Sequence, residues 1–363
     1  MTETEAFVAL NMLPGLGPVR IRALLARLGG PCQILGARRA DFSGIEGVGS
    51  AVLRTLLDWE KHADVAAELE RARKAGVRVI TLRDPEYPET LRQIHDPPTV
   101  LYCLGGLEPR DKTALGVVGT RKPTAYGESC AKKLSYQLAY AGITVVSGLA
   151  RGVDTLAHQA ALAAHGRTVA VIGSGLSAIY PSENIPLAEK IAMSGAVLSE
   201  FPMTTVADRQ SFPMRNRIVS GMSFGILVIE AAVRSGALIT ASQAGDQGRS
   251  LYAVPGRMDS LQSGGTNRLI QQGAKLVLSA QDILDDLGLL FPKEPDLEKP
   301  AAPPSLGEIE RRVFDALGDE ETLMDTLVER TGLPTQEVSS TLLALEIRKL
   351  VKPVSGGRFV KTL

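Results

Sequence analysis

The sequence is poor in the residues that build metal centres and disulfide frameworks. Its 363 residues include three cysteines, Cys32, Cys103 and Cys130, and four histidines. The histidines and cysteines show no zinc-site spacing, and the widely separated cysteines show no disulfide pattern. We therefore expect no metal site, and we interpret the cysteines as small buried residues of a protein in a reducing compartment.

The sequence also lacks an excess of positive or negative charge. The chain has 40 Lys and Arg against 40 Asp and Glu, with a formal net charge of +0. This balance excludes a surface that is positive all over, but it leaves room for a local basic groove that binds nucleic acid. Hydrophobic residues make up 44% and charged residues 22%, a profile typical of a globular protein with a core.

The sequence shows no leader, membrane span or nucleotide-binding loop. The start, MTETEAFVAL, has acids and no basic region, and no apolar run is long enough to cross a bilayer. No Walker sequence, serine elbow or cysteine–histidine pair is present. We expect a cytoplasmic protein without membrane association or cofactor. His158 fits a packed helix residue, so an enzyme would depend on carboxylates, chiefly Glu230.

Residues 1–70 show a helical pattern with a weak internal duplication. LPGLGPVRIRALL, from Leu13, matches IEGVGSAVLRTLL, from Ile45, and each has a Gly-x-Gly turn before an amphipathic helix. This resembles a pair of helix-hairpin-helix units, in which backbone N–H groups at the glycine turn contact DNA phosphates. A small helical packing module with the same turns is the alternative, because few arginines lie near them.

Residues 71–288 alternate short apolar runs with amphipathic helical stretches. This pattern predicts an α/β fold, a doubly wound and mostly parallel Rossmann-like sheet that binds ligands beyond the carboxyl ends of its strands. After two short strands in VRVITL and TVLYCLGG, we expect strands at Ala114–Val118, Ile143–Ser147, Thr168–Ile172, Ala196–Ser199, Gly225–Glu230, Leu251–Val254 and Lys275–Leu278.

The C-terminal part begins with a proline-rich, charged stretch at 289–305, which we interpret as a linker. Residues 306–363 predict three helices and a hairpin around Gly356 and Gly357, a winged-helix arrangement. The third helix has Glu337 and Glu346 and no basic residue before Arg348, whereas a helix that reads a DNA groove normally exposes basic or amide side chains. We therefore expect this module to contact protein, with only wing residues such as Arg358 and Lys361 able to reach phosphates.

Glycine-rich turns follow several of the expected strands. They are Gly119-Thr120-Arg121, the loop from Ser147 to Asp154, Gly173-Ser174-Gly175, and the stretch that ends at Asn267. Such turns and helix N-termini expose backbone N–H groups that hold phosphates. Together with nearby arginines they predict an anion-binding rim. Gly173, Gly175 and Ala178 also fit a dinucleotide fingerprint, but Pro181 would break the helix that such a site requires.

The stretch SFPMRNRIVSG places two arginines in the first turn of a helix, because Pro213 can only open one. Cations at a helix N-terminus are normally unfavourable. Arg215 and Arg217 therefore indicate either a bound anion or ion pairs with Asp208, Glu200 or Glu230.

These motifs together resemble the DNA-processing protein A (DprA/Smf) family. The residues that carry the resemblance run in family order: VVGTRKPTAYG, SGLARGVDTLAH, IGSGLSAIYPSEN, SFPMRNRIVSGMS, VIEAAVRSGALITA, and GRSLYAVPG with GGTNRLI. The resemblance implies an extended Rossmann-like domain that dimerises, binds single-stranded DNA and loads the RecA recombinase in transformation. The family is not known as an enzyme, so we expect no catalytic residue.

The resemblance also implies a DNA pocket. It assigns phosphate contacts to Arg121 and to Arg209, and base stacking to Phe212. Arg151 stands where many relatives have lysine, and Ser182 replaces a basic residue found in some of them. The full candidate set is Gly119, Thr120, Arg121, Ser147, Gly148, Arg151, Gly173, Gly175, Arg209, Phe212, Arg215, Asn216, Arg217 and Asn267.

One alternative is an enzyme of the phosphoribohydrolase type on a related fold. Those enzymes have a Pro-Gly-Gly-x-Gly-Thr-x-x-Glu loop near the later strands. Here the comparable place reads EAAVRSGALIT and lacks that loop, which favours the binding protein over the enzyme.

Overall fold

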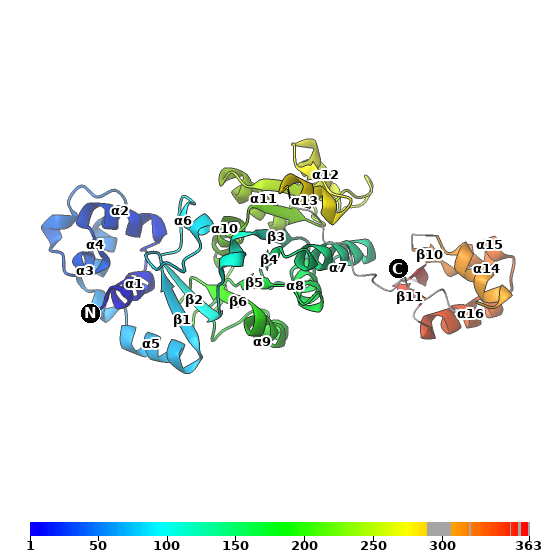
Figure 1. Ribbon diagram of the computed structural model, residues 1–363, viewed down its shortest axis with the longest axis horizontal. Coiled ribbons are helices and arrows are strands. Elements are labelled where there is room, and N and C mark those ends of the chain that lie inside the picture. The colour runs from blue at the N-terminus through cyan, green and yellow to red at the C-terminus, as the bar shows by residue number, and fades with distance from the viewer. Residues whose placement is uncertain (289–305, 319–320, 349, 355–356, 362–363) are drawn as a thin grey trace. The chain divides into compact units, whose positions relative to one another are not determined.

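The computed structural model describes residues 1–288, 306–318, 321–348, 350–354 and 357–361. They form two compact units, Met1–Phe291 and Pro292–Leu363 (Figure 1). The predicted linker, 289–305, lies outside the described residues. The helical N-terminus and the sheet, which the sequence suggests as separate modules, fall in the first unit.

The N-terminal region is helical, as expected, with α1 (Glu3–Met12), α2 (Pro18–Leu28), α3 (Pro31–Leu35), α4 (Ser50–Leu57) and α5 (Val65–Lys74). The two duplicated turns lie together, because Arg20 donates a hydrogen bond to the Gly15 carbonyl and packs against Gly47. Phe7 of α1 joins the apolar cluster of Tyr102 in the sheet. The helical region therefore shares a core with the sheet.

The sheet of the first unit has nine strands in the order β1-β2-β6-β5-β4-β3-β7-β8-β9, and those from β6 to β9 in this order run parallel. The chain winds outward from β3 in one direction and returns to its other side at β7, which confirms the doubly wound α/β class. All the expected strands are present, with ends shifted by a residue or two: β1 (Val77–Thr81), β2 (Val100–Gly105), β3 (Ala114–Val118), β4 (Thr144–Ser147), β5 (Thr168–Val171), β6 (Ala196–Ser199), β7 (Gly225–Val228), β8 (Ser250–Ala253) and β9 (Lys275–Leu276).

Helices cover both faces of this sheet (Figure 1). One face packs on α10 (Ser211–Gly221) and α11 (Gly236–Asp246), and the opposite face on α7 (Ala125–Tyr140), α8 (Val153–Ala163) and α13 (Ala280–Asp286). Burial on both faces explains why the strands are continuous apolar runs. The remaining helices of the unit are α6 (Glu89–Arg92), α9 (Ile185–Ser194) and α12 (Gly264–Gln271).

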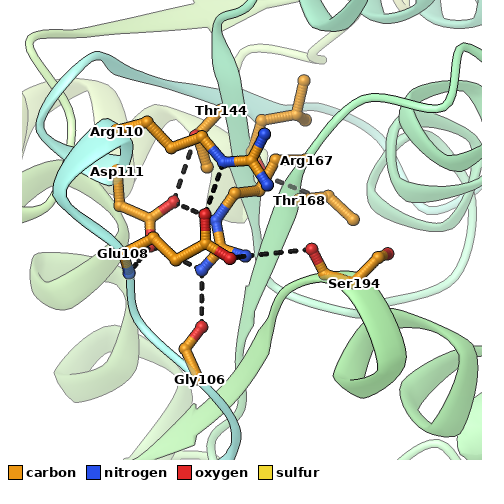
Figure 2. A network of polar contacts seen from close by, with 9 residues as sticks. Gly106, Glu108, Arg110, Asp111, Thr144, Arg167, Thr168 and Ser194 are labelled. Atoms are coloured by element: carbon orange, nitrogen blue, oxygen red, sulfur yellow. Dashed lines mark hydrogen bonds and ion pairs between the residues drawn. The ribbon is translucent and has the colours of Figure 1, made fainter.

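A buried ionic network ties the amino ends of the parallel strands together (Figure 2). Arg167, which directly precedes β5 and is 4% exposed, forms a bidentate pair with Asp111 through Nε (2.5 Å) and Nη2 (2.7 Å). Its Nη1 donates to Glu108 Oε1 at 3.1 Å and to the Ser194 carbonyl at 2.9 Å. Thr144 Oγ1 donates to Asp111 Oδ1 at 3.1 Å. This arginine is saturated by acceptors from several chain segments.

The second unit has the predicted winged-helix elements: α14 (Glu308–Ala316), β10 (Thr322–Leu323), α15 (Met324–Thr331), α16 (Thr335–Ile347), β11 (Val351–Val354) and β12 (Arg358–Lys361). Val313, Leu327 and Leu342 lie in its core. The third helix, α16, exposes Gln336, Ser339 and Leu343, and a protein-contact role for this module stays a prediction. In neither unit does the described part of the chain contain a helix with the length and apolarity to cross a membrane.

Candidate nucleic-acid interface

A solvent-open pocket lies beyond the carboxyl ends of β3, β4 and β5. It has about 340 Å³ of empty volume, including the solvent at its mouth. Its lining brings together residues that are far apart in the sequence: Arg121, Gly148, Ala150, Arg151, Gly173, Tyr180, Pro181, Phe212 and Arg215. Six of the fourteen candidate residues therefore gather at one place.

One wall of the pocket is aromatic and carries a cation. Phe212 lies in the first turn of α10, and the Arg121 guanidinium carbon is 5.2 Å from its ring centroid. Tyr180 tilts against Phe212 at 49°, with 6.1 Å between ring centroids. Tyr180 is missing from the candidate set, although its place directly before Pro181 in a glycine-rich turn is a usable signal. A flat apolar surface beside an exposed arginine suits a nucleotide, which has a π-face and an anionic phosphate.

The pocket floor depends on Arg215, which is 5% exposed. Its Nη1 donates to the Val171 carbonyl at 2.5 Å and also to that of Gly148, and its Nε donates to Asn216 Oδ1 at 3.1 Å. A side chain at Gly148 would overlap the guanidinium, which explains this glycine. Burial lowers the pKa of Arg215, and Asp154 opposes that shift. Arg215 thus supplies positive charge from below rather than as a free side chain.

The structure corrects the prediction that Arg215 and Arg217 lie in the first turn, because α10 begins at Ser211 and places both beyond it. Arg217 also has acidic partners. Its guanidinium points away from the pocket into a buried ion pair with Glu200, and its Nε lies 3.0 Å from Asp96 Oδ2. The alternative of ion pairing therefore holds for Arg217, because two acids at adjacent segments neutralise it before any ligand arrives. Arg217 is not among the residues that line the pocket, and a DNA contact there stays a prediction.

Other candidates also have internal roles instead of lining the pocket. Ser147 Oγ donates to the Val117 carbonyl at 2.6 Å. The Gly175 N–H donates to the Thr205 carbonyl at 2.8 Å. Asn267 clamps Gly256 with two hydrogen bonds, at 2.9 Å and 3.1 Å. These hydrogen bonds shape the loops, and direct DNA contact by the three residues stays a prediction.

The Gly-Thr-Arg loop is held by Glu230. The Thr120 N–H donates to the Glu230 carbonyl at 2.7 Å, and the Glu230 carboxylate accepts hydrogen bonds from Thr124 N (2.9 Å) and Oγ1 (2.6 Å). Gly119 allows close packing on Val153. The carboxylate on which an enzyme would depend belongs to a residue that is 2% exposed, and it is already bound to Thr124.

Some of the backbone N–H groups that were predicted to bind phosphate already donate hydrogen bonds within the chain. Asp154 Oδ2 accepts from the N–H groups of Gly148 at 3.1 Å and Ala150 at 3.4 Å. The Gly173 N–H, by contrast, has no hydrogen-bond partner among the described residues. The charge at the rim thus comes mainly from side chains, of which Arg121, Arg151 and Arg209 are exposed.

His158 is buried on α8 and does not line the pocket. Its Nδ1 is 2.7 Å from Thr168 Oγ1. Burial lowers the pKa of His158 to about 3, and the charge of Arg215 acts in the same direction. It is a neutral packed residue, as the sequence predicts. No cluster of three or more potential metal ligands occurs in the described ranges.

Comparisons with known proteins agree on one relationship. The family model of DNA recombination-mediator protein A matches residues 78–288, and that of the DprA winged helix domain matches residues 297–357. The chain is 34% identical to Protein Smf of Synechocystis sp., over 99% of this chain and 98% of that protein. It is 44% identical to the DNA processing protein DprA of Bacillus subtilis, over 59% of this chain and 73% of that protein.

Two solved structures are similar as well. DNA processing protein A from Streptococcus pneumoniae has a TM-score of 0.67 at 32% identity, covering 80% of this chain and 99% of that one. The same protein from Helicobacter pylori, whose structure concerns its single-stranded DNA binding mode, has a TM-score of 0.52 at 30% identity, covering 59% of this chain and 97% of that one.

Proposed function

The chain belongs to the DNA processing protein A (DprA/Smf) family, and from this premise we propose that it binds single-stranded DNA in the pocket beyond β3, β4 and β5. The observation that carries the proposal is the pairing of exposed Arg121 with the Phe212 ring at 5.2 Å. A phosphate neutralised by an arginine releases condensed counterions, and a base stacked on an aromatic ring adds about 1–3 kcal/mol without sequence preference. The Helicobacter pylori relative supports this assignment, because its structure concerns single-stranded DNA binding.

Binding of a fluorescent oligo-dT, followed by anisotropy over a salt series, tests the proposal. We expect affinity to fall steeply with salt, and Phe212→Ala to weaken binding by about fivefold to a hundredfold. Arg121→Ala should also weaken binding and should reduce the salt dependence. Arg73→Ala removes an exposed arginine of α5 that pairs with Glu70, and serves as the matched control. Unchanged affinity in both pocket variants, or binding that ignores salt, contradicts the proposal.

Protection of single-stranded DNA and loading of the RecA recombinase during natural transformation complete the proposal. The matching family model is that of a recombination mediator, which supports a role beside a recombinase. Nucleotide hydrolysis has less support, since buried Glu230 is bound to Thr124. Release of adenine from AMP by the purified chain would reverse this ranking.

We also propose that the chain dimerises through the Rossmann-like domain. Strand β9 is an edge of the sheet. Large apolar side chains follow the carboxyl ends of β8 and β9, with Met258 97%, Leu261 86% and Leu278 77% exposed. Apolar groups in this arrangement favour association with a second copy. Analytical ultracentrifugation of the whole chain tests this, and a monomer at micromolar concentration contradicts it.

A further inference from the structure

Arg151, one of the exposed cations of the pocket, already has an anionic partner. Its Nε and Nη2 reach the two carboxylate oxygens of Glu183 at 2.5 Å and 2.7 Å. The side chains are 54% and 52% exposed. This bidentate arrangement uses the same planar donor pair that an arginine offers to a phosphate. Glu183 and a DNA phosphate therefore compete for one set of donors.

The position of Glu183 is fixed by the fold. It lies in the turn Ser182–Asn184, directly after Pro181, which lines the pocket. Asn184 is buried and donates through Nδ2 to the Leu149 carbonyl at 2.8 Å and to Thr155 Oγ1 at 2.9 Å. The turn is thus tied to the loop that carries Arg151, and this connection keeps the Glu183 carboxylate close to the Arg151 guanidinium.

We propose that Glu183 is a built-in competitor that occupies Arg151 until a DNA phosphate displaces it, and so sets the affinity and salt response of the pocket. This inference rests on the proposed single-stranded DNA binding. The Glu183 carboxylate carries its charge at neutral pH, as an ordinary glutamate does, and the hydrogen bond from Arg151 lowers its pKa further. A displaced Glu183 remains beside the bound phosphate, and like charges repel.

The test is a double-mutant cycle read by oligo-dT anisotropy. Exposed ion pairs are worth little, so Glu183→Gln should tighten binding by about twofold to fivefold at low salt. The gain should shrink as salt rises, because screening weakens both the ion pair and the repulsion. In the Arg151→Gln background, Glu183→Gln should change affinity much less, since no donor pair remains to be released.

Glu189→Gln is the matched control for the loss of one negative charge. Glu189 is exposed on α9 and forms no ion pair within the described part of the chain. Equal gains in Glu183→Gln and Glu189→Gln, an equal gain with and without Arg151, or weaker binding in Glu183→Gln would each overturn the inference. If the wild-type chain and Glu183→Gln both fail to bind oligo-dT, the proposed function itself fails, which is a separate result.

Discussion

Arginines at the two ends of the parallel sheet have opposite surroundings. At the amino end, Arg167 is 4% exposed and its donors are taken by Asp111, Glu108 and two backbone carbonyls (Figure 2). At the carboxyl end, Arg121 is exposed, lies over Phe212 and forms no ion pair among the described residues. The same side chain therefore stabilises the fold where buried acids surround it, and remains available to an anion where they do not.

Position along the sheet does not by itself decide whether an arginine is available to an anion. Arg217 also lies near the carboxyl ends, in α10, yet it is 5% exposed and paired with Glu200 and Asp96. What separates Arg217 from Arg121 is the presence of carboxylates within reach. The comparison makes a simple claim: substituting arginines that are buried with acids changes the free energy of unfolding, whereas substituting rim arginines changes DNA affinity.

The largest expected effect is on the saturated side. Arg167→Met leaves Asp111 as an uncompensated charge that is 7% exposed, and breaking such a buried pair costs about 3–5 kcal/mol of unfolding free energy. We expect a much lower urea midpoint for the first unit and unchanged oligo-dT affinity per folded molecule. Chemical denaturation followed by circular dichroism, together with anisotropy at low urea, measures both quantities.

Arg110→Met is the matched control at the same network. Arg110 pairs with Glu108 at 2.7 Å, but its side chain is 60% exposed, so its loss should change stability by less than about 1 kcal/mol. A wild-type midpoint in Arg167→Met, or a selective loss of DNA affinity there, would show that burial with acids does not separate the two kinds of arginine.

The comparison also explains what the sequence could predict. Glycine turns after apolar runs place their residues at one sheet edge, because parallel strands share the direction of their carboxyl ends. That rule correctly gathers Arg121, Gly148 and Gly173 in the pocket. It depends on local pattern and fold class, both of which the chain carries strongly.

Whether a single side chain is paired or exposed depends on partners that are distant in the sequence, and a local sequence pattern does not contain them. Glu200 is one of the acids that the sequence analysis proposes for Arg217, and it is a partner in the structure. The other partner, Asp96, was not proposed, because it comes from a distant segment before β2. Asp154 accepts hydrogen bonds from two backbone N–H groups of the glycine-rich loop, which the sequence alone suggests are free. Tyr180 lines the pocket beside Phe212, but a tyrosine before a proline does not by itself indicate a base-stacking surface.

A second prediction concerns His158, which is buried on α8 with its Nδ1 2.7 Å from Thr168 Oγ1. Its pKa is lowered to about 3 in the folded chain, whereas an unfolded histidine titrates near 6.5. The unfolded state therefore binds a proton between these values while the folded state does not, so stability falls as pH falls below about 6.5. From pH 7.5 to 5.0 this group alone should cost about 2 kcal/mol.

His158→Asn removes that titration while keeping a polar atom near the position of Nδ1. Wild type should be the more stable protein at pH 7.5, and its advantage should shrink by about 2 kcal/mol at pH 5.0. Urea unfolding at the two pH values measures the gap, with exposed His62→Asn as the control for removing a histidine. A gap that is constant or widens with acid would mean that His158 is not held neutral in the folded chain.

The smallest effect is the sharpest test of the rim. Arg209 is exposed in the loop before α10 and forms no ion pair in the part of the chain that the structure describes. Arg209→Gln should leave unfolding within about 0.5 kcal/mol of wild type. It should weaken oligo-dT binding a few-fold and reduce the slope of log K against log salt by about 0.7, the share of one phosphate contact on a single strand.

Lys112→Gln removes an exposed cation at the amino end of the sheet, where no contact with DNA is proposed, and should change neither quantity. If the two variants shift the slope equally, the DNA responds to overall charge and not to a rim at the carboxyl end, because only a localised contact can distinguish two exposed cations of the same sign.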